Sequence, residues 1–234
     1  MDILEKLMNF GLTRQEAVIY SLLFSEGKLN GYEASKLSGI SKSNTYSTLA
    51  SLVDKGAAYM LQENAISYMP VDIEEFCNNK IRFLNELKEE LILDIPKKRQ
   101  KMDGYITIRG KKNILDKLKN MLLSAKERVY IFMSLNRINE LKDILKELIK
   151  QNIKVVIITD KAFILDGAKL YLKECDDSQI RIIIDSTYVL TGEIENEQSS
   201  TCLYSSNSNL VDVFKQALAN EIKLIEIDRE VISS

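Results

Sequence analysis

The sequence TRQEAVIYSLLFSEGKLNGYEASKLSGISKSNTYSTLASLVDKG, residues 13–56, determines the fold that we expect for the N-terminal part of the chain. Its first part, residues 13–26, predicts a helix, because Thr13 and Glu16 have the spacing of a capping box and apolar residues recur at helical spacing. These apolar residues are Ala17, Tyr20, Leu23 and Phe24. Gly27 is well placed to end this helix.

A short amphipathic helix is expected over residues 32–38, after an Asn-Gly turn sequence. Gly39 is placed to end it. The side chains expected to face inward are Ala34 and Leu37. With the preceding helix, this segment gives two helices joined by a short turn.

A longer helix is expected next, because Ser41 is a good N-cap residue and Lys55-Gly56 is a typical helix end. Its apolar stripe consists of Tyr46, Leu49, Leu52 and Val53. Tyr46 could stack on a sugar or base, but its position on this stripe favours packing in the core.

A β-hairpin is expected after the third helix. Residues 57–61 and 66–69 are strand-like runs on either side of Gln62-Glu63-Asn64. Three helices followed by a hairpin are the order of a winged helix-turn-helix domain, which we place over residues 1–71.

The start of the third helix carries a polar and basic face that lacks acidic residues. Neither Asp nor Glu occurs from Ala34 through Val53, whereas Lys36 and Lys42 are present. Small polar or basic side chains at the start of a recognition helix can reach the base edges and phosphates of DNA. The expected DNA-binding residues are Lys36, Ser41, Lys42, Ser43, Asn44, Tyr46, Ser47 and, on the hairpin, Gln62 and Asn64. The alternatives are a merely solvated face and a winged helix that contacts protein instead of DNA.

Residues 7–71 resemble the winged-helix domain of the TrmB family of archaeal and bacterial transcriptional regulators. The resemblance is carried by FGLT, by EA and Y in the first helix, by LSGIS, by TYSTLASLVDKG, and by a hairpin that ends in Y and P. The sequence departs from the family at Ser43 and Asn44, where a basic residue is usual at one or more positions. The resemblance implies a regulator that binds double-stranded operator DNA.

Residues 72–95 predict a long helix whose near-heptad apolar spacing is interrupted by Lys80. The apolar stripe consists of Ile73, Phe76, Phe83 or Leu84, Leu87 and Leu91. Two such helices from two subunits would bury the stripe and place two recognition helices about one DNA turn, roughly 34 Å, apart. We therefore expect a homodimer, with packing of the stripe on its own domain as the alternative. Pro96 and a basic run at 97–101, expected to be solvated, complete a connector over residues 72–102.

Residues 103–234 predict an α/β domain, because strand-like and helical segments alternate. The expected strands are 105–108, 129–133, 154–159, 180–184, 188–191 and 202–204, and the expected helices are 111–124, 136–151, 163–173 and 209–223. This order resembles the phospholipase-D-like sensor domain of many TrmB-family regulators. The expected fold class of the whole chain is therefore α+β, with a winged helix-turn-helix, a long connector helix and a phospholipase-D-like α/β domain.

Enzymatic activity is not expected, because the chain contains no histidine. Active phospholipase-D-like enzymes use a histidine, a lysine two residues later and an aspartate seven residues after the histidine. If Asp185 is that aspartate, Ser178 and Ile180 occupy the other two positions, and the nucleophile is absent. Three cysteines without a CxxC pair favour neither a disulfide framework nor a zinc site, so we expect no metal and no cofactor. Gly110-Lys111-Lys112 lacks the other residues of a P-loop and is interpreted as an ordinary helix start.

Candidate effector-binding residues follow the predicted strands, because ligands of open α/β sheets lie beyond the carboxyl ends of strands. They are Ser134, Asn136, Asp160, Lys161 and Asp185, each of which is also an ordinary cap or turn residue. The resemblance makes a sugar-like effector one option, although the chain has no tryptophan to stack on a sugar.

The sequence also bears on the location and the partners of the chain. No stretch approaches the length of about 20 apolar residues that a membrane span needs, and the N-terminus lacks the layout of a signal peptide, so we expect a cytoplasmic protein without a membrane partner. The net charge of −2 requires any DNA contact to come from a local patch. We expect a sequence-specific, homodimeric regulator that senses a small molecule. The alternative is a winged-helix scaffold of the transcription machinery without sequence-specific DNA binding.

Overall fold

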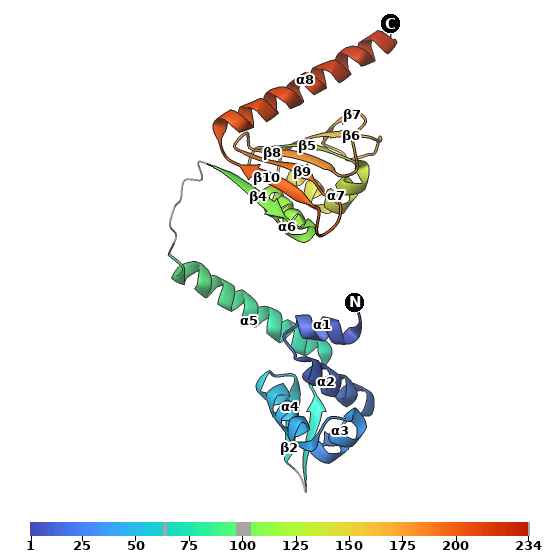
Figure 1. Ribbon diagram of the computed structural model, residues 1–234, viewed down its shortest axis with the longest axis vertical. Coiled ribbons are helices and arrows are strands. Elements are labelled where there is room, and N and C mark those ends of the chain that lie inside the picture. Colours follow the sequence, from blue (N-terminus) through green and yellow to red (C-terminus); the bar gives the residue numbers. More distant parts are fainter. Residues whose placement is uncertain (63–64, 97–103, 234) are drawn as a thin grey trace. The chain divides into compact units, whose positions relative to one another are not determined.

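The computed structural model describes residues 1–62, 65–96 and 104–233 (Figure 1). The chain divides into two units, Met1–Lys98 and Arg99–Ser234. The first unit consists of helices with a small sheet, and the second contains a larger sheet with helices on both faces. The expected α+β fold class is thus confirmed, while the basic run 97–101 lies outside the described residues.

The first unit begins with four short helices, α1 (Ile3–Asn9), α2 (Arg14–Glu26), α3 (Gly31–Ser38) and α4 (Lys42–Asp54). The first three begin with complete capping boxes, in which an N-cap side chain and a glutamate three residues later satisfy each other's backbone amides. The pairs are Asp2 with Glu5, Thr13 with Glu16, and Asn30 with Glu33. Gly27 and Gly39 have positive φ angles and end α2 and α3, as predicted.

A three-stranded antiparallel sheet completes the winged helix. Strands β2 (Ala58–Gln62) and β3 (Ile66–Pro70) form the predicted hairpin. A third strand, β1 (Leu29–Asn30), pairs with the outer edge of β3 to give the order β1-β3-β2. We did not predict β1, because two residues are too few to show a strand period.

The core of the first unit contains the apolar residues predicted to face inward from α2, α3 and α4, with three exceptions. Ala17, Tyr20, Leu23, Leu49 and Leu52 are buried together. Phe24, Leu37 and Tyr46, expected to face inward, are 44%, 54% and 51% exposed. Helical spacing identifies the direction of an apolar stripe but not its width, and these three residues lie at the edges of their stripes.

The helix α5 (Ile73–Asp94) forms the connector that the sequence predicts. Its Phe76 was expected on a dimerisation stripe, but it is only 3% exposed and packs against Tyr20, with ring centroids 5.7 Å apart. Phe76 therefore belongs to the core of the winged helix and is not available to a second subunit. The other expected stripe residues are exposed: Ile73, Phe83, Leu84, Leu87 and Leu91.

The second unit is built on a seven-stranded mixed sheet of order β4-β10-β9-β8-β5-β6-β7. Its strands are β4 (Tyr105–Arg109), β5 (Arg128–Met133), β6 (Lys154–Thr159), β7 (Lys169–Leu172), β8 (Gln179–Ile184), β9 (Tyr188–Glu193) and β10 (Thr201–Ser205). Strands β5, β6 and β7 are parallel, whereas β8, β9, β10 and β4 form an antiparallel series joined to β5. Helices α6 (Lys111–Leu123) and α7 (Leu135–Lys150) pack on one face, and α8 (Ser208–Ser233) packs on the other (Figure 1).

One predicted helix of the second unit is wrong. Residues 163–173, expected to be helical, form a loop followed by the edge strand β7. Phe163, Leu165 and Ala168 are partly buried against the core, so their near-helical spacing reflects loop side chains that fill the same hydrophobic layer. The remaining strands and helices are confirmed, and the last helix is longer than predicted.

A buried carboxylate connects α2 to α4 inside the first unit. Glu16 accepts a hydrogen bond of 2.7 Å from Lys55 Nζ, one of 2.6 Å from Ser51 Oγ and one of 2.6 Å from the Thr13 amide. Lys55 Nζ also donates to the Gly11 carbonyl, at 2.9 Å. Burial raises the pKa of Glu16, but these hydrogen bonds outweigh it and hold the pKa below its ordinary value of 4.5.

We expect Glu16→Gln to reduce the free energy of unfolding of the first unit by about 1 to 2 kcal/mol at neutral pH, because a neutral amide loses the charge-assisted contact to the partly exposed Lys55. Because the folded-state pKa is lowered, this stabilisation is present above pH 4.5 and is lost as the pH falls through the folded-state value. Urea unfolding of the full chain, followed by NMR signals of α2 and α4 over this pH range, measures it.

Glu33→Gln is the matched control for this experiment. Glu33 has the same capping-box position in α3, but it is exposed and bonds to the Asn30 amide at 2.9 Å. We expect it to change stability by no more than about 0.5 kcal/mol. Equal losses in the two variants would contradict the special role of Glu16.

Candidate functional site

The turn between α3 and α4 is held by hydroxyl groups on its inner side. Ser35 Oγ donates to the Ile40 carbonyl at 2.7 Å, and Thr45 Oγ1 donates to the carbonyls of Ile40 and Ser41 at 3.3 and 3.0 Å. Ser41 Oγ accepts from the Asn44 amide at 3.4 Å, as a helix N-cap does. Because Ser35 and Thr45 are buried, they hold the start of α4 from its inner side, and the outer side of the helix is left free.

The expected DNA-binding residues are exposed wherever the structure describes them. They are Lys36, Ser41, Lys42, Ser43, Asn44, Tyr46, Ser47 and Gln62, whereas Asn64 lies outside the described residues. The structure also adds Tyr32, which is exposed and lies beneath Lys42 Nζ, 4.9 Å from its ring centroid. Tyr32 could not be predicted from the sequence, because its contact with Lys42 depends on the angle between α3 and α4.

The ring of Tyr46 lies against the first residue of α3. A Cβ atom at Gly31 would be only 2.3 Å from Tyr46 Cε1, so glycine is needed here for close approach. This contact places Tyr46 beside Tyr32 and Lys42 on one exposed surface, defined here as the α3–α4 face. Tyr46 is thus a surface residue supported by backbone, which corrects the prediction of core packing.

The charges on the α3–α4 face are available to a ligand. Neither Lys36 nor Lys42 forms an ion pair with any carboxylate in the described part of the chain. The nearest acidic residue in sequence, Glu33, uses its carboxylate to accept the Asn30 amide. The face therefore offers two unpaired ammonium groups, small hydroxyls and two tyrosine rings, a combination suited to phosphate and base edges.

Four of the five expected effector-binding residues lie close to one another at the carboxyl ends of β5 and β6. Ser134 Oγ donates to Asp177 Oδ1, and Asn136 Nδ2 donates to the same oxygen at 3.3 Å. Asp160 accepts from the Leu135 amide at 2.7 Å, which lowers its pKa, and its other oxygen lies 3.9 Å from Lys161 Nζ. We did not predict Asp177, because it precedes β8 instead of following a strand. The cluster satisfies most of its own polar groups.

The fifth residue, Asp185, lies at the opposite end of the strands, where β5 begins. Strand β8 is antiparallel to β5 and pairs Ile184 with Val129, so the end of β8 meets the beginning of β5. The Asp185 carboxylate accepts three backbone amides, from Lys126 at 2.9 Å, Glu127 at 2.8 Å and Arg128 at 2.9 Å. Grouping Asp185 with the other four residues was wrong, because that rule assumes parallel strands.

The positions compared with phospholipase-D-like enzymes have structural roles. Ile180 is buried in the core of the sheet, and Ser178 Oγ donates to Asp176 at 2.7 Å. Over residues 1–62, 65–96 and 104–233, no group of three or more cysteine or carboxylate side chains is placed to hold a metal ion. Within those same ranges, no helix has both the length and the apolar character needed to cross a membrane.

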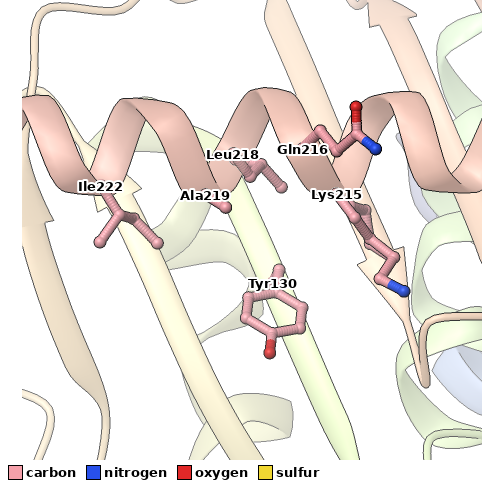
Figure 2. A pocket seen from close by; sticks show the side chains of 7 residues that line it. Tyr130, Lys215, Gln216, Leu218, Ala219 and Ile222 are labelled. Carbon is pink, nitrogen blue, oxygen red and sulfur yellow. The ribbon is translucent and has the colours of Figure 1, made fainter.

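A hollow of about 350 Å³ lies between α8 and the sheet (Figure 2). Figure 2 shows Tyr130 on the sheet below the helix, with Leu218, Ala219 and Ile222 projecting from α8 toward it. The lining is mainly apolar, and Lys215 at its side pairs with Asp212 at 3.4 Å. This hollow therefore has little free polar character.

Helices α2, α3 and α4, the hairpin that follows them and the exposed α3–α4 face define a winged helix-turn-helix protein. The family model described as sugar-specific transcriptional regulator TrmB matches residues 7–74. The match to this family of transcriptional regulators covers the winged helix and the first two residues of α5.

Two relatives extend the match beyond the winged helix. The uncharacterized protein YrhO of Bacillus subtilis is 27% identical over 242 residues, which cover 97% of this chain and 86% of that protein. TrmBL1 of Pyrococcus furiosus, an HTH-type sugar sensing transcriptional regulator, is 25% identical over 171 residues, or 68% of this chain. That match covers 48% of TrmBL1, so the chain spans about half the length of this relative.

Two solved structures are similar to the chain at low identity. TrmBL2, described as an archaeal chromatin protein with a novel mode of DNA binding, is 21% identical with a TM-score of 0.45, covering 94% of this chain and 97% of that one. Nuc from Salmonella typhimurium, a phospholipase D family member, is 14% identical with a TM-score of 0.39. The match covers 50% of this chain and 93% of the Nuc chain.

The contact between Gly31 and Tyr46 gives a double-variant prediction. We expect Gly31→Ala to destabilise the wild-type chain, because the new methyl group displaces the Tyr46 ring. In a Tyr46→Ala background the same change is expected to stabilise by about 0.5 kcal/mol, because alanine is the better helix residue. Urea unfolding of the four proteins of this cycle measures the coupling. Additive effects would show that the ring does not rest on Gly31.

Proposed function

We propose that this chain is a sequence-specific DNA-binding transcriptional regulator that acts as a homodimer and senses a small molecule through its second unit. The observation that carries the proposal is the exposed start of α4, where Lys42 and Asn44 stand free of any carboxylate. In winged helix-turn-helix proteins this end of the recognition helix enters the major groove.

The roles of the individual residues follow from their positions. In this proposal the exposed Lys36 and Lys42 contact phosphates, and the exposed Ser43, Asn44 and Ser47 contact base edges. Tyr46 is exposed beside them and offers a ring to a sugar or base. Gln62 at the end of β2 extends the surface onto the hairpin.

The homodimer is supported by the exposed apolar side of α5. Leu84, Leu87 and Leu91 line one continuous groove, which Ile92 and Ile95 extend toward the end of the helix. A helix of 22 residues with this much exposed apolar surface is better explained by a second copy than by water. Two copies joined here would present two recognition helices to a symmetric operator.

An enzymatic function receives no support from the residues of the second unit. Ser178, Ile180 and Asp185 do not provide a nucleophile next to a general base, and the chain has no histidine. A protein-binding scaffold is the second candidate, because the same α3–α4 face would also suit an acidic protein partner.

DNA binding is expected to weaken steeply with salt, since lysine contacts to phosphates release counterions. For DNA from upstream of the protein's own gene, Lys42→Ala should reduce the slope of log affinity against log salt by about 1. Lys42→Ala combined with Asn44→Ala should abolish binding. Fluorescence anisotropy over a range of salt concentrations measures both effects.

Lys6→Ala is the control for this titration, because Lys6 is an exposed lysine on α1, outside the α3–α4 face. It should leave both affinity and slope unchanged. Binding that is absent, or insensitive to salt, would refute the DNA-binding proposal and favour the scaffold.

Leu87→Asp is expected to convert the homodimer to a monomer, because it places a charge in the apolar groove of α5. Asn85→Asp adds the same carboxylate two residues away at an exposed position outside the groove and should leave the dimer intact. Sedimentation equilibrium gives the mass of each protein. If Leu87→Asp has the same mass as the wild type, dimerisation does not use this groove.

A further inference from the structure

A second hollow in the sheet unit, of about 590 Å³, lies between α6 and the β8–β9 turn. It lies at the end of the strands where Asp185 is found, and the Ser134 cluster lies at the other end. Lys117, Asn120, Ser124, Lys126, Tyr188 and Tyr204 supply most of its chemistry. Its size falls within the range of about 300 to 1,000 Å³ that is typical of small-molecule sites.

An unpaired lysine lies over an aromatic ring inside this hollow. Lys117 Nζ lies 3.7 Å from the centroid of the Tyr204 ring, and the Tyr188 ring stacks parallel to Tyr204 with centroids 6.0 Å apart. Among the described residues, no carboxylate pairs with Lys117. Burial lowers the pKa of the Lys117 ammonium, and the face of the Tyr204 ring is the partner that the structure gives it.

Two acidic residues, Asp185 and Glu127, also line the hollow, and both interact with their own neighbours. Asp185 accepts three backbone amides of the loop before β5. Glu127 pairs with Arg128 at 3.4 Å. Among the described residues neither Lys117 nor Lys126 forms an ion pair with these carboxylates, so both ammonium groups are free to bind an anion.

We propose that this hollow binds a small organic anion with a planar ring. Its anionic group lies between Lys117 and Lys126, its ring packs on the partly exposed Tyr188, and Asn120 donates to its polar substituents. Ring stacking on tyrosine and charge-assisted hydrogen bonds from lysine are the interactions on which this proposal depends.

The other two sites in this unit are less suited to such a ligand. The Ser134 cluster satisfies its polar groups internally, and the hollow under α8 is mainly apolar, with Lys215 already paired to Asp212. The identification of this anion as the effector rests on the proposed regulatory function. Binding of the anion itself does not.

The test is a titration of the full chain with phenyl phosphate, monitored by isothermal calorimetry. We expect saturable binding to the wild type and binding about tenfold or more weaker for Lys117→Met, which keeps the apolar stem over Tyr204 but loses the charge. Lys119→Met is the matched control, because Lys119 is an exposed lysine on the same helix outside the hollow, and its affinity should equal that of the wild type.

A second variant separates the ring contact from the charge. Tyr188→Leu should weaken phenyl phosphate but leave the weaker binding of inorganic phosphate unchanged, since only the former has a ring to stack. Thermal unfolding of each variant verifies that it is folded. Absence of saturable binding to the wild type, or equal binding by folded Lys117→Met, would overturn the proposal.

DNA binding by the ligand-free protein, measured in parallel, keeps the two proposals distinct. Loss of phenyl phosphate binding with intact DNA binding refutes the anion site but not the regulator. Anion binding without DNA binding supports the site and refutes the regulatory function.

Discussion

The position of α4 depends on polar contacts that are buried on its inner side. Glu16 binds Ser51 and Lys55 at the end of the helix, and the hydroxyls of Ser35 and Thr45 secure its beginning. A buried carboxylate is tolerated here only because its oxygens have hydrogen-bond partners. With both ends fixed from within, every outward side chain of α4 is left exposed in a defined direction, which is what recognition of a groove requires.

The local features of the winged helix could be predicted from the sequence, because they depend on neighbouring residues. The capping box at Thr13 and the end of α3 at Gly39 follow from rules that operate over three or four residues. The exposed polar face of α4 followed from the same spacing. Tyr32 and Tyr46 were missed or misplaced, since their positions depend on how α3 meets α4 in space.

In the second unit, the predictions fail where strand direction matters. The segments of the sheet could be located from apolar runs, but no short-range signal states that β8 is antiparallel to β5. Because of this strand direction, Asp185 lies at the opposite end of the strands from Asp160. There it accepts backbone amides of the loop before β5. The wrong helix at 163–173 has a different cause, because loop residues there fill the core at near-helical spacing.

The charge distribution restricts how a polyanion can approach the first unit. The chain has a net charge of −2, yet the segment from Ala34 through Val53 contains no acidic residue. On α5, by contrast, Glu74, Glu75 and Glu86 are exposed. Since an acidic surface repels phosphates and an acid-free one does not, approach through the α3–α4 face is favoured over approach through the acidic sides of α5. A weakly acidic protein can thus select one docking orientation without a large basic field, because repulsion elsewhere contributes to specificity as much as attraction at the contact.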